Sequence, residues 1–283
     1  MSNQTALLGC DTHVHVIGAS SRFPMVTNRH YTPGSASVVD LRQHLHRQGL
    51  GRVVIIQPSV YGNDNNCLFD ALAELGSSAC GIAVLDRTIS LAELQQLDAK
   101  GIRGIRLNFE SSANHSIDQL QEALGFWAPR IQALGWHIQI YAPFTVTAAS
   151  SQCIASLPVP VVLDHFALWP AQAQETEAKL QVLKLLEDGN IYIKLSASYR
   201  QSELNSNQLT QLAHHLLKVR PDRLLWASDW PHTNRELGVD ALSVSRYREV
   251  EPGHLLIERN EWLSTPEAKD LVLINNPARL YRF

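Results

Sequence analysis

Two histidines one residue apart, His13 and His15, could together hold a metal ion or an anionic group of a substrate. They lie in the apolar run 8–16, which is typical of a β-strand. Because side chains alternate along a strand, both imidazoles are expected on one face, with Val14 on the other. A pair at this spacing also occurs without a function, so at this point a binding site and a purely structural pair are equal alternatives.

Two further apolar runs end in side chains that can carry protons. His165 follows one of them and Asp229 follows the other. A carboxylate at the end of a buried strand is costly unless it is paired, bound to a metal or functional, which makes Asp229 a candidate general base. The alternatives are a helix cap or loop hydrogen bond for Asp229 and a satisfied core histidine for His165. Three such strand ends in one chain favour a shared site.

Other strand ends carry cations and hydroxyls. Arg106 and Arg200 indicate an organic acid as substrate, because a guanidinium matches a carboxylate with two parallel hydrogen bonds. Either arginine could instead form a structural salt bridge. Tyr141 at another strand end, and Tyr31 and Ser59 in loops, could add hydrogen bonds to a bound substrate.

Most of these residues lie in eight short runs rich in Val, Ile and Leu that alternate with amphipathic stretches. The runs are 8–16, 52–59, 79–86, 101–109, 136–142, 159–167, 191–198 and 223–231, and helices are expected near 38–49, 64–76, 90–100, 118–134, 145–156, 173–188, 206–219 and 265–275. Such alternation is typical of a parallel sheet covered by helices. Eight repeats predict an α/β fold, a single (β/α)8 TIM barrel domain over residues 1–283, whose active site lies at the C-terminal ends of the strands.

An open, doubly wound sheet is the alternative fold. It is disfavoured because no glycine-rich phosphate-binding loop follows the first strand. The two longest irregular stretches are expected at 17–37 and 232–264, where a barrel carries its substrate loops.

The composition excludes several classes of protein. Of the 283 residues, 45% are hydrophobic and 18% are charged, which suits a large core and not a disordered or fibrous chain. A formal net charge of −3 at pH 7 gives no support to binding of nucleic acid or anionic membranes. The chain shows neither a signal peptide nor an apolar run near the roughly 20 residues of a membrane span, so we expect a cytoplasmic protein.

The four cysteines, Cys10, Cys67, Cys80 and Cys153, are far apart in the sequence. Their spacing matches neither a zinc knuckle nor a disulfide framework. We therefore expect buried free thiols.

With His13-x-His15, His165 and the segment Ser228-Asp229-Trp230-Pro231-His232 at three strand ends, the chain resembles the amidohydrolase superfamily of TIM barrels over essentially its whole length. Within that superfamily it looks most like the group of 2-pyrone-4,6-dicarboxylate lactonases, sulfomuconolactone hydrolases and sugar-acid lactone isomerases. The segments that carry this likeness are 31–33, 57–65, 104–109, 196–200 and 276–281.

The resemblance implies hydrolysis of a lactone of a small organic acid. Asp229 would activate the attacking water, and His13, His15 and His165 would surround the lactone carbonyl. Arg106, Tyr141, Arg200 and Tyr31 match positions that contact the anionic substrate. A sugar-acid lactone isomerase or a zinc-dependent decarboxylase on the same scaffold is the alternative, and a non-catalytic binding barrel is a third.

The chain departs from the superfamily pattern at its fourth and fifth strands. Metal-dependent members carry a lysine or glutamate and a histidine there, where this chain has Arg106 and Tyr141, so no binuclear site is expected. We expect no obligatory cofactor; the alternative is one divalent ion, zinc, held by His13, His15, His165 and Asp229.

The pyrone lactonases also carry a second arginine shortly after the one on the fourth strand, where this chain has Glu110-Ser111-Ser112-Ala113-Asn114-His115. This difference favours a lactone acid of another shape. A homo-oligomer is compatible with the sequence and is not predicted by it.

Overall fold

Eight parallel strands form the centre of the computed structural model, which describes residues 9–110, 116–171, 174–201 and 203–283. In their order around the sheet they are β1 Cys10–Val14, β3 Arg52–Ile56, β4 Ala79–Ala83, β5 Ile102–Asn108, β6 His137–Tyr141, β7 Val161–Leu163, β8 Ile191–Ser196 and β9 Leu224–Ala227. The ring closes between the last strand and the first: Asp229 N–H donates to the carbonyl of His13 at 3.0 Å, and His15 N–H donates to that of Trp230 at 2.8 Å. The predicted barrel and all eight of its strands are confirmed.

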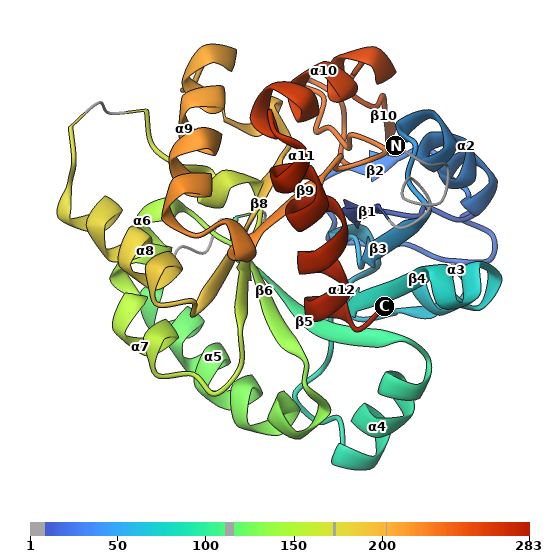
Figure 1. The fold of residues 1–283 in the computed structure, drawn as a ribbon. Helices are drawn as coiled ribbons and strands as arrows, with labels where there is room; N and C mark the ends of the chain where they lie inside the picture. The colour runs from blue at the N-terminus through green and yellow to red at the C-terminus, as the bar shows by residue number, and fades with distance from the viewer. Residues whose placement is uncertain (1–8, 111–115, 172–173, 202) are drawn as a thin grey trace.

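Helices surround the strands on the outside (Figure 1). They are α2 Val38–Gln48, α3 Asn66–Leu75, α4 Leu91–Ala99, α5 Ile117–Ile131, α6 Phe144–Ala149, α7 Ser151–Ala155, α8 Glu177–Glu187, α9 Ser206–Val219, α10 Pro252–Trp262, α11 Pro266–Lys269 and α12 Asn276–Tyr281. The helix predicted at 145–156 is interrupted at Ser150, which separates α6 from α7. A π-helical turn, Asp270–Asn275, joins α11 to α12.

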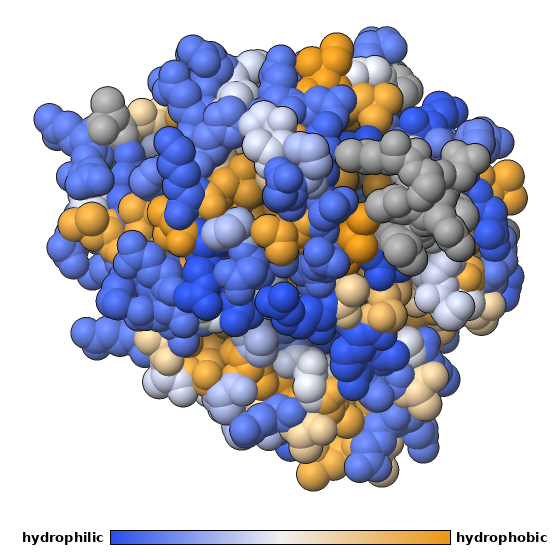
Figure 2. All heavy atoms as spheres, viewed as in Figure 1, coloured by the Kyte–Doolittle hydropathy of each residue, from blue (hydrophilic) through white to orange (hydrophobic). Residues whose placement is uncertain are grey.

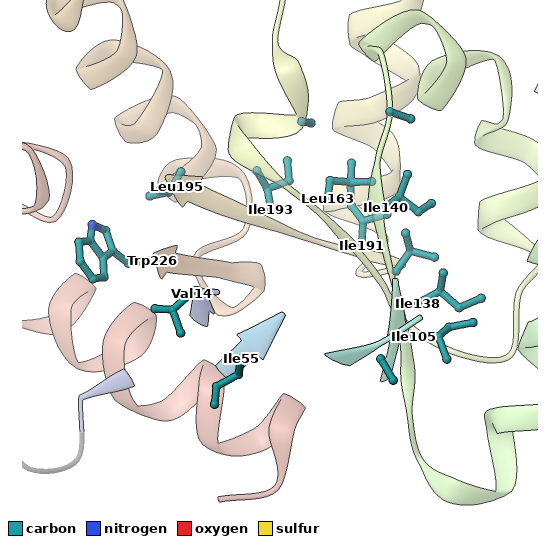
Figure 3. Packing of buried hydrophobic residues seen from close by; sticks show 14 of the residues in the cluster. Val14, Ile55, Ile105, Ile138, Ile140, Leu163, Ile191, Ile193, Leu195 and Trp226 are labelled. Atoms are coloured by element: carbon teal, nitrogen blue, oxygen red, sulfur yellow. The ribbon is translucent and has the colours of Figure 1, made fainter. Parts of the chain in front are cut away.

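Side chains alternate along each strand between the outer surface of the barrel, which is apolar, and its interior, which holds both apolar and polar side chains. On β6, Ile138 and Ile140 join the apolar layer between strands and helices (Figure 3), while Gln139 between them points the other way. Burying an isoleucine side chain of this kind contributes about 1.5–3 kcal/mol. The outer layer therefore holds the strands in place and leaves the opposite positions free for polar groups.

A second apolar cluster fills the barrel at the N-terminal ends of the strands. It consists of Cys10, Val54, Ile56, Cys80, Ile82, Val162, Tyr192, Leu225, Leu280 and Tyr281. The last two come from α12, so the C-terminal end of the chain closes this end of the barrel. His137, the first residue of β6, packs against Tyr281 at this end.

The expectation of an irregular stretch at 232–264 is wrong for its last third, which forms α10. Among the side chains of this helix that the structure describes, only Leu255, Glu258 and Trp262 are buried. One of these three is charged and the apolar Ile257 is exposed, so the apolar residues of the sequence do not follow the buried face. The loops at both predicted stretches are tied together, because β2 Thr32–Pro33 pairs in parallel with β10 Val244–Ser245.

The cysteines behave largely as expected. Cys10, Cys67 and Cys80 are buried free thiols, and Cys153 is half-buried. Hydrophilic residues predominate on the face drawn in Figure 2, with apolar residues in separate groups between them. Among the helices that the structure describes, none combines the length and the apolar character needed to span a bilayer.

Asp11 joins the two strands at the closing seam. Its Oδ1 accepts hydrogen bonds from the backbone N–H groups of His13 at 3.2 Å and Ser228 at 3.0 Å, and its Oδ2 lies 3.2 Å from Nε2 of His44 on α2. The carboxylate is fully buried. It therefore replaces ladder hydrogen bonds where β1 and β9 meet beside the polar end of the barrel.

Replacing Asp11 by alanine should lower the free energy of unfolding by about 2–4 kcal/mol, because two buried backbone donors lose their acceptor. Asp11→Asn should lose less, since an amide oxygen can still accept from them. Urea titration followed by circular dichroism measures both. Asp188→Ala, which removes a surface pair with Lys184, is the control and should change stability by less than about 0.5 kcal/mol. An Asp11→Ala variant as stable as this control would contradict the role of Asp11 in the seam.

Candidate active site

A cavity of about 290 Å³ opens at the C-terminal ends of the strands. All five residues predicted to contact a substrate line it: Tyr31, Ser59, Arg106, Tyr141 and Arg200. His15, His165 and Asp229 of the predicted catalytic set also line it. His13 is fully buried directly behind them, with its ring centroid 4.9 Å from those of both His15 and His165. The structure thus gathers residues from seven strand ends, or the loops that follow them, at one place.

His13 on β1 and His15 directly after it face the same way, as predicted. The pairing register between β1 and β3 shifts between Asp11 and Val14, in the stretch that holds His13. The two Nε2 atoms lie 3.3 Å apart. Nδ1–H of His15 donates to the carbonyl of Ile56 at 2.8 Å, so the Nε2 of a neutral His15 carries a lone pair.

Asp229 follows β9 with a left-handed backbone, φ 61°, which costs a non-glycine residue about 1 kcal/mol. Its Oδ2 accepts from the hydroxyl of Tyr199 and from Nε of Arg200, both at 2.7 Å. Its Oδ1 is buried and has no hydrogen-bond partner among the described residues. One oxygen is therefore held firmly, while the other remains available.

The available oxygen points at three imidazoles. Oδ1 of Asp229 lies 3.6 Å from Nε2 of His13, 3.7 Å from Nε2 of His15 and 3.9 Å from Nε2 of His165. These separations are too long for hydrogen bonds and leave room for a shared small group such as a water oxygen or an ion.

His165 reaches this position through an unusual turn. The four residues His165–Leu168 all have positive φ, between 50° and 56°, in a left-handed region that L-residues seldom occupy in succession. The carbonyl of His165 accepts a hydrogen bond from the side-chain amide of Gln201, and its Nδ1 lies 2.9 Å from Oγ of Ser196. These contacts from the neighbouring strand hold the ring against the cavity.

Burial sets the protonation of the cluster. It lowers the pKa of His13 well below its usual value and those of His15 and His165 to about 4, so all three are neutral at pH 7. Burial also raises the pKa of Asp229, but the positive charge of the Arg200 guanidinium outweighs it and holds that pKa well below the usual value. An ionised carboxylate thus faces three neutral imidazoles.

These donors fit a single metal ion. Tetrahedral zinc, with ligand bonds of about 2.0–2.1 Å, separates its ligand atoms by roughly 3.3 Å. His13, His15 and Asp229 approach that spacing with 3.3, 3.6 and 3.7 Å. A second group of potential ligands, His13, Asp164 and His165, adjoins the first. The four residues predicted as ligands are divided between these two groups.

A buried ion pair beneath the cluster was missed by the sequence analysis. Nζ of Lys194 on β8 donates to Oε1 of Gln139 at 2.8 Å and lies 3.3 Å from Oδ1 of Asp164 and 3.3 Å from Nδ1 of His13. Burial lowers the pKa of Lys194 to about 8, against the opposing effect of Asp164, so it stays an ammonium at neutral pH. A lysine in the middle of a buried apolar strand was the signal that could have revealed it.

Asp164 connects this pair to His13 and to the cavity. Its Oδ1 lies 3.2 Å from Nδ1 of His13, its Oδ2 accepts from the amide of Gln139 at 3.0 Å, and Nε of Arg106 is 3.8 Å from the same Oδ2. Burial raises the pKa of Asp164, but the Lys194 ammonium and His13 reduce it to well below the usual value. Asp164 is therefore ionised.

The arginines of the cavity differ in how many ion pairs and hydrogen bonds they form with other residues of the protein. Arg200 forms the ion pair with Asp229 that the sequence left open, and its Nη2 reaches Oγ1 of Thr233 at 3.3 Å. Arg106 is buried beside the ring of Tyr141, and its Nε has no hydrogen-bond partner among the described residues. Arg248 also lines the cavity and was not predicted, because it lies on the loop after β9. Its guanidinium packs over the ring of Tyr199, and its Nε has no hydrogen-bond partner among the described residues.

The chain is similar to known proteins over nearly its whole length. The amidohydrolase family model matches residues 10–283. A 2-pyrone-4,6-dicarboxylate hydrolase of Comamonas testosteroni is 34% identical, and a 4-sulfomuconolactone hydrolase of Rhizobium radiobacter is 30% identical; each match covers 96% of this chain and 89% of the relative.

Among solved structures, a probable 2-pyrone-4,6-dicarboxylic acid hydrolase of Acinetobacter baumannii with citric acid bound superposes with a TM-score of 0.81. It is 25% identical, and the match covers 98% of this chain and all of the other. Segment 111–115, within the stretch where the sequence has no second arginine, lies outside the described residues; Glu110 before it lines the cavity.

Replacing Arg200 by methionine should lower the free energy of unfolding by about 2–4 kcal/mol, because the buried Asp229 carboxylate loses its paired charge. The double variant Arg200→Met/Asp229→Asn, which buries no unpaired charge at this pair, should lose less than the single variant. Urea unfolding measures the cycle, with Arg246→Met at the exposed pair with Glu236 as control. A double variant less stable than Arg200→Met alone would contradict this account of the pair.

Proposed function

The chain belongs to the amidohydrolase family, and we propose that it acts there as a lactonase that hydrolyses a cyclic ester of a small organic acid. Two relatives with at least 30% identity are named as hydrolases of a pyrone dicarboxylate and of a sulfomuconolactone, which supports this substrate class. The observation that carries the proposal is the free Oδ1 of Asp229, which faces three neutral imidazoles at the floor of a cavity that arginines line.

Asp229 acts as the general base. Its Oδ1 takes a proton from a water molecule placed between the carboxylate and the imidazoles, and the water oxygen attacks the carbonyl carbon of the lactone. Oδ2 stays bound to Tyr199 and Arg200, so the carboxylate keeps its orientation while it gains the proton. The addition forms a C–O bond and moves the carbonyl electrons onto oxygen.

The resulting oxyanion needs hydrogen-bond donors already in place. When Nδ1 of His165 accepts from the hydroxyl of Ser196 at 2.9 Å, its Nε2–H is directed at the cavity and can serve as one donor. Collapse of the tetrahedral intermediate breaks the ring C–O bond. Asp229, now protonated, returns its proton to the leaving oxygen, and the product is the open hydroxy acid.

Arg106 and Arg248 orient the substrate. Both residues line the cavity, and the Nε of each has no hydrogen-bond partner among the described residues. A guanidinium binds a carboxylate with two parallel hydrogen bonds. The acid group of the substrate therefore binds on the Arg106 and Arg248 side, and its ester carbonyl lies toward Asp229.

A divalent ion such as zinc, held by His13, His15 and Asp229 with His165 beside them, would act as a Lewis acid that polarises the lactone carbonyl. The acid group of the substrate would be held by the same residues, Arg106, Arg248 and Tyr141, with or without a bound metal ion.

Replacing Asp229 by asparagine should lower kcat by about 10²–10⁴-fold, because the amide cannot accept the proton of water. Affinity for the substrate acid, measured by calorimetry, should be largely kept. Turnover is followed with a pH indicator on a panel that includes 2-pyrone-4,6-dicarboxylate and other acidic lactones. Glu110→Gln removes another carboxylate of the cavity and should retain most of the activity.

Substantial activity of Asp229→Asn across the panel would contradict the role of Asp229 as base. If the wild-type chain consumes a lactone without releasing net acid, and nuclear magnetic resonance shows a second lactone as product, the chain is an isomerase and not a hydrolase.

Arg106→Met should raise KM for acidic lactones by about 10- to 100-fold, the loss of one charge-assisted contact, and should leave KM for neutral lactones nearly unchanged. Arg235→Met, at the exposed rim of the same cavity, should change either value far less. Steady-state kinetics on paired acidic and neutral lactones tests this. Equal changes for both classes would remove Arg106 from recognition of the acid.

A further inference from the structure

Lys194 competes with Asp164 for a single nitrogen of His13. An ammonium has three N–H donors, and three acceptor atoms surround Nζ of Lys194: Oε1 of Gln139 at 2.8 Å, Oδ1 of Asp164 at 3.3 Å and Nδ1 of His13 at 3.3 Å. The same Nδ1 lies 3.2 Å from Oδ1 of Asp164. Because one nitrogen cannot both accept from Lys194 and donate to Asp164, the two contacts favour opposite tautomers of His13.

The tautomer decides what His13 presents to the cavity. With the proton on Nδ1, the Nε2 lone pairs of His13 and His15 and the free Oδ1 of Asp229 converge within 3.3–3.7 Å, an arrangement that suits a cation. With the proton on Nε2, His13 donates to Nε2 of His15 at 3.3 Å, and this hydrogen bond uses the Nε2 atoms of both imidazoles, which are then not available to a cation.

We propose that Lys194 is a positioning residue that holds His13 in the tautomer protonated at Nε2 and thereby disfavours a divalent cation among His13, His15 and Asp229. Lys194 acts through hydrogen bonding and through charge, since its buried ammonium also repels a nearby cation. Asp164 acts in the opposite sense, because it favours the proton on Nδ1. The inference concerns the state of the site and is independent of lactone hydrolysis.

Lys194 also explains the second group of potential ligands, His13, Asp164 and His165. Nζ already contacts the first two of these residues, and both Nζ and the carboxylate are fully buried. The ammonium therefore supplies the positive charge that the Asp164 carboxylate would otherwise take from a metal ion.

The test measures zinc affinity of the full chain by competition with a chromogenic chelator, after metal removal. Lys194→Met should bind Zn²⁺ at least about tenfold more tightly than the wild type, and Asp164→Asn at least about tenfold more weakly, in the range known for residues that orient metal ligands. Lys184→Met, which removes an exposed lysine, is the matched control and should leave the affinity unchanged.

Lys194→Met leaves the Asp164 charge buried without its partner, so its folding is checked by thermal melting. If it does not fold, the variant Lys194→Met/Asp164→Asn is compared with Asp164→Asn alone, and the same tightening of at least about tenfold is expected. Equal or weaker zinc binding after loss of Lys194 in the folded variant would overturn the proposal.

A second readout reports the tautomer directly. Nitrogen chemical shifts of histidine labelled with ¹⁵N, in the metal-free chain, should show His13 protonated at Nε2 in the wild type and at Nδ1 in Lys194→Met. A purely structural Lys194 would leave these shifts in place. His13 protonated at Nδ1 in the wild type would overturn the proposal even if zinc affinity changed.

Discussion

An ionised carboxylate inside the barrel, that of Asp229, is the constraint on which the rest of the site depends. Removing such a charge from water costs several kcal/mol unless other groups replace the lost hydration. Tyr199 and Arg200 replace it at one oxygen, and three imidazoles surround the other without bonding to it. The left-handed backbone at Asp229 is the local cost of directing the carboxylate into this environment.

The interior of the barrel changes in polarity from one end to the other. Apolar side chains and the C-terminal Tyr281 fill the end near the strand beginnings. Above them the Lys194–Asp164 pair forms a layer in which each charge has several polar partners, and Asp229 and the histidines lie above that pair. Because the charges of Asp164 and Lys194 neutralise each other, the two residues influence His13 more through their hydrogen bonds to its Nδ1 than through their net charge.

The sequence predicted what depends on regular patterns and missed what depends on partners from distant strands. Alternation identified the eight strands and placed His13 and His15 on one face, and strand ends identified His165 and Asp229. Lys194 and Gln139 went unnoticed, although a charged or amide side chain among apolar neighbours of a buried strand marks a position facing the barrel axis. Their contacts join residues of four strands or strand ends, and no local pattern in the sequence records such contacts. Arg248 lies in a loop, where periodicity carries no information about direction.

The arrangement also shows why counting arginines in a sequence overstates the positive charge available to a substrate. Arg200 faces the cavity, yet its Nε is bound to Asp229, and the two charges compensate each other. Neither Arg106 nor Arg248 has a hydrogen bond at Nε among the described residues. Arg106 makes a longer contact of 3.8 Å with Asp164, a carboxylate that Lys194 also compensates, so both arginines keep positive charge for whatever fills the cavity. Glu110 lines the same space and opposes them. The protein as a whole carries −3, and the local surplus that attracts a small acid results from which arginines Asp229 leaves unpaired.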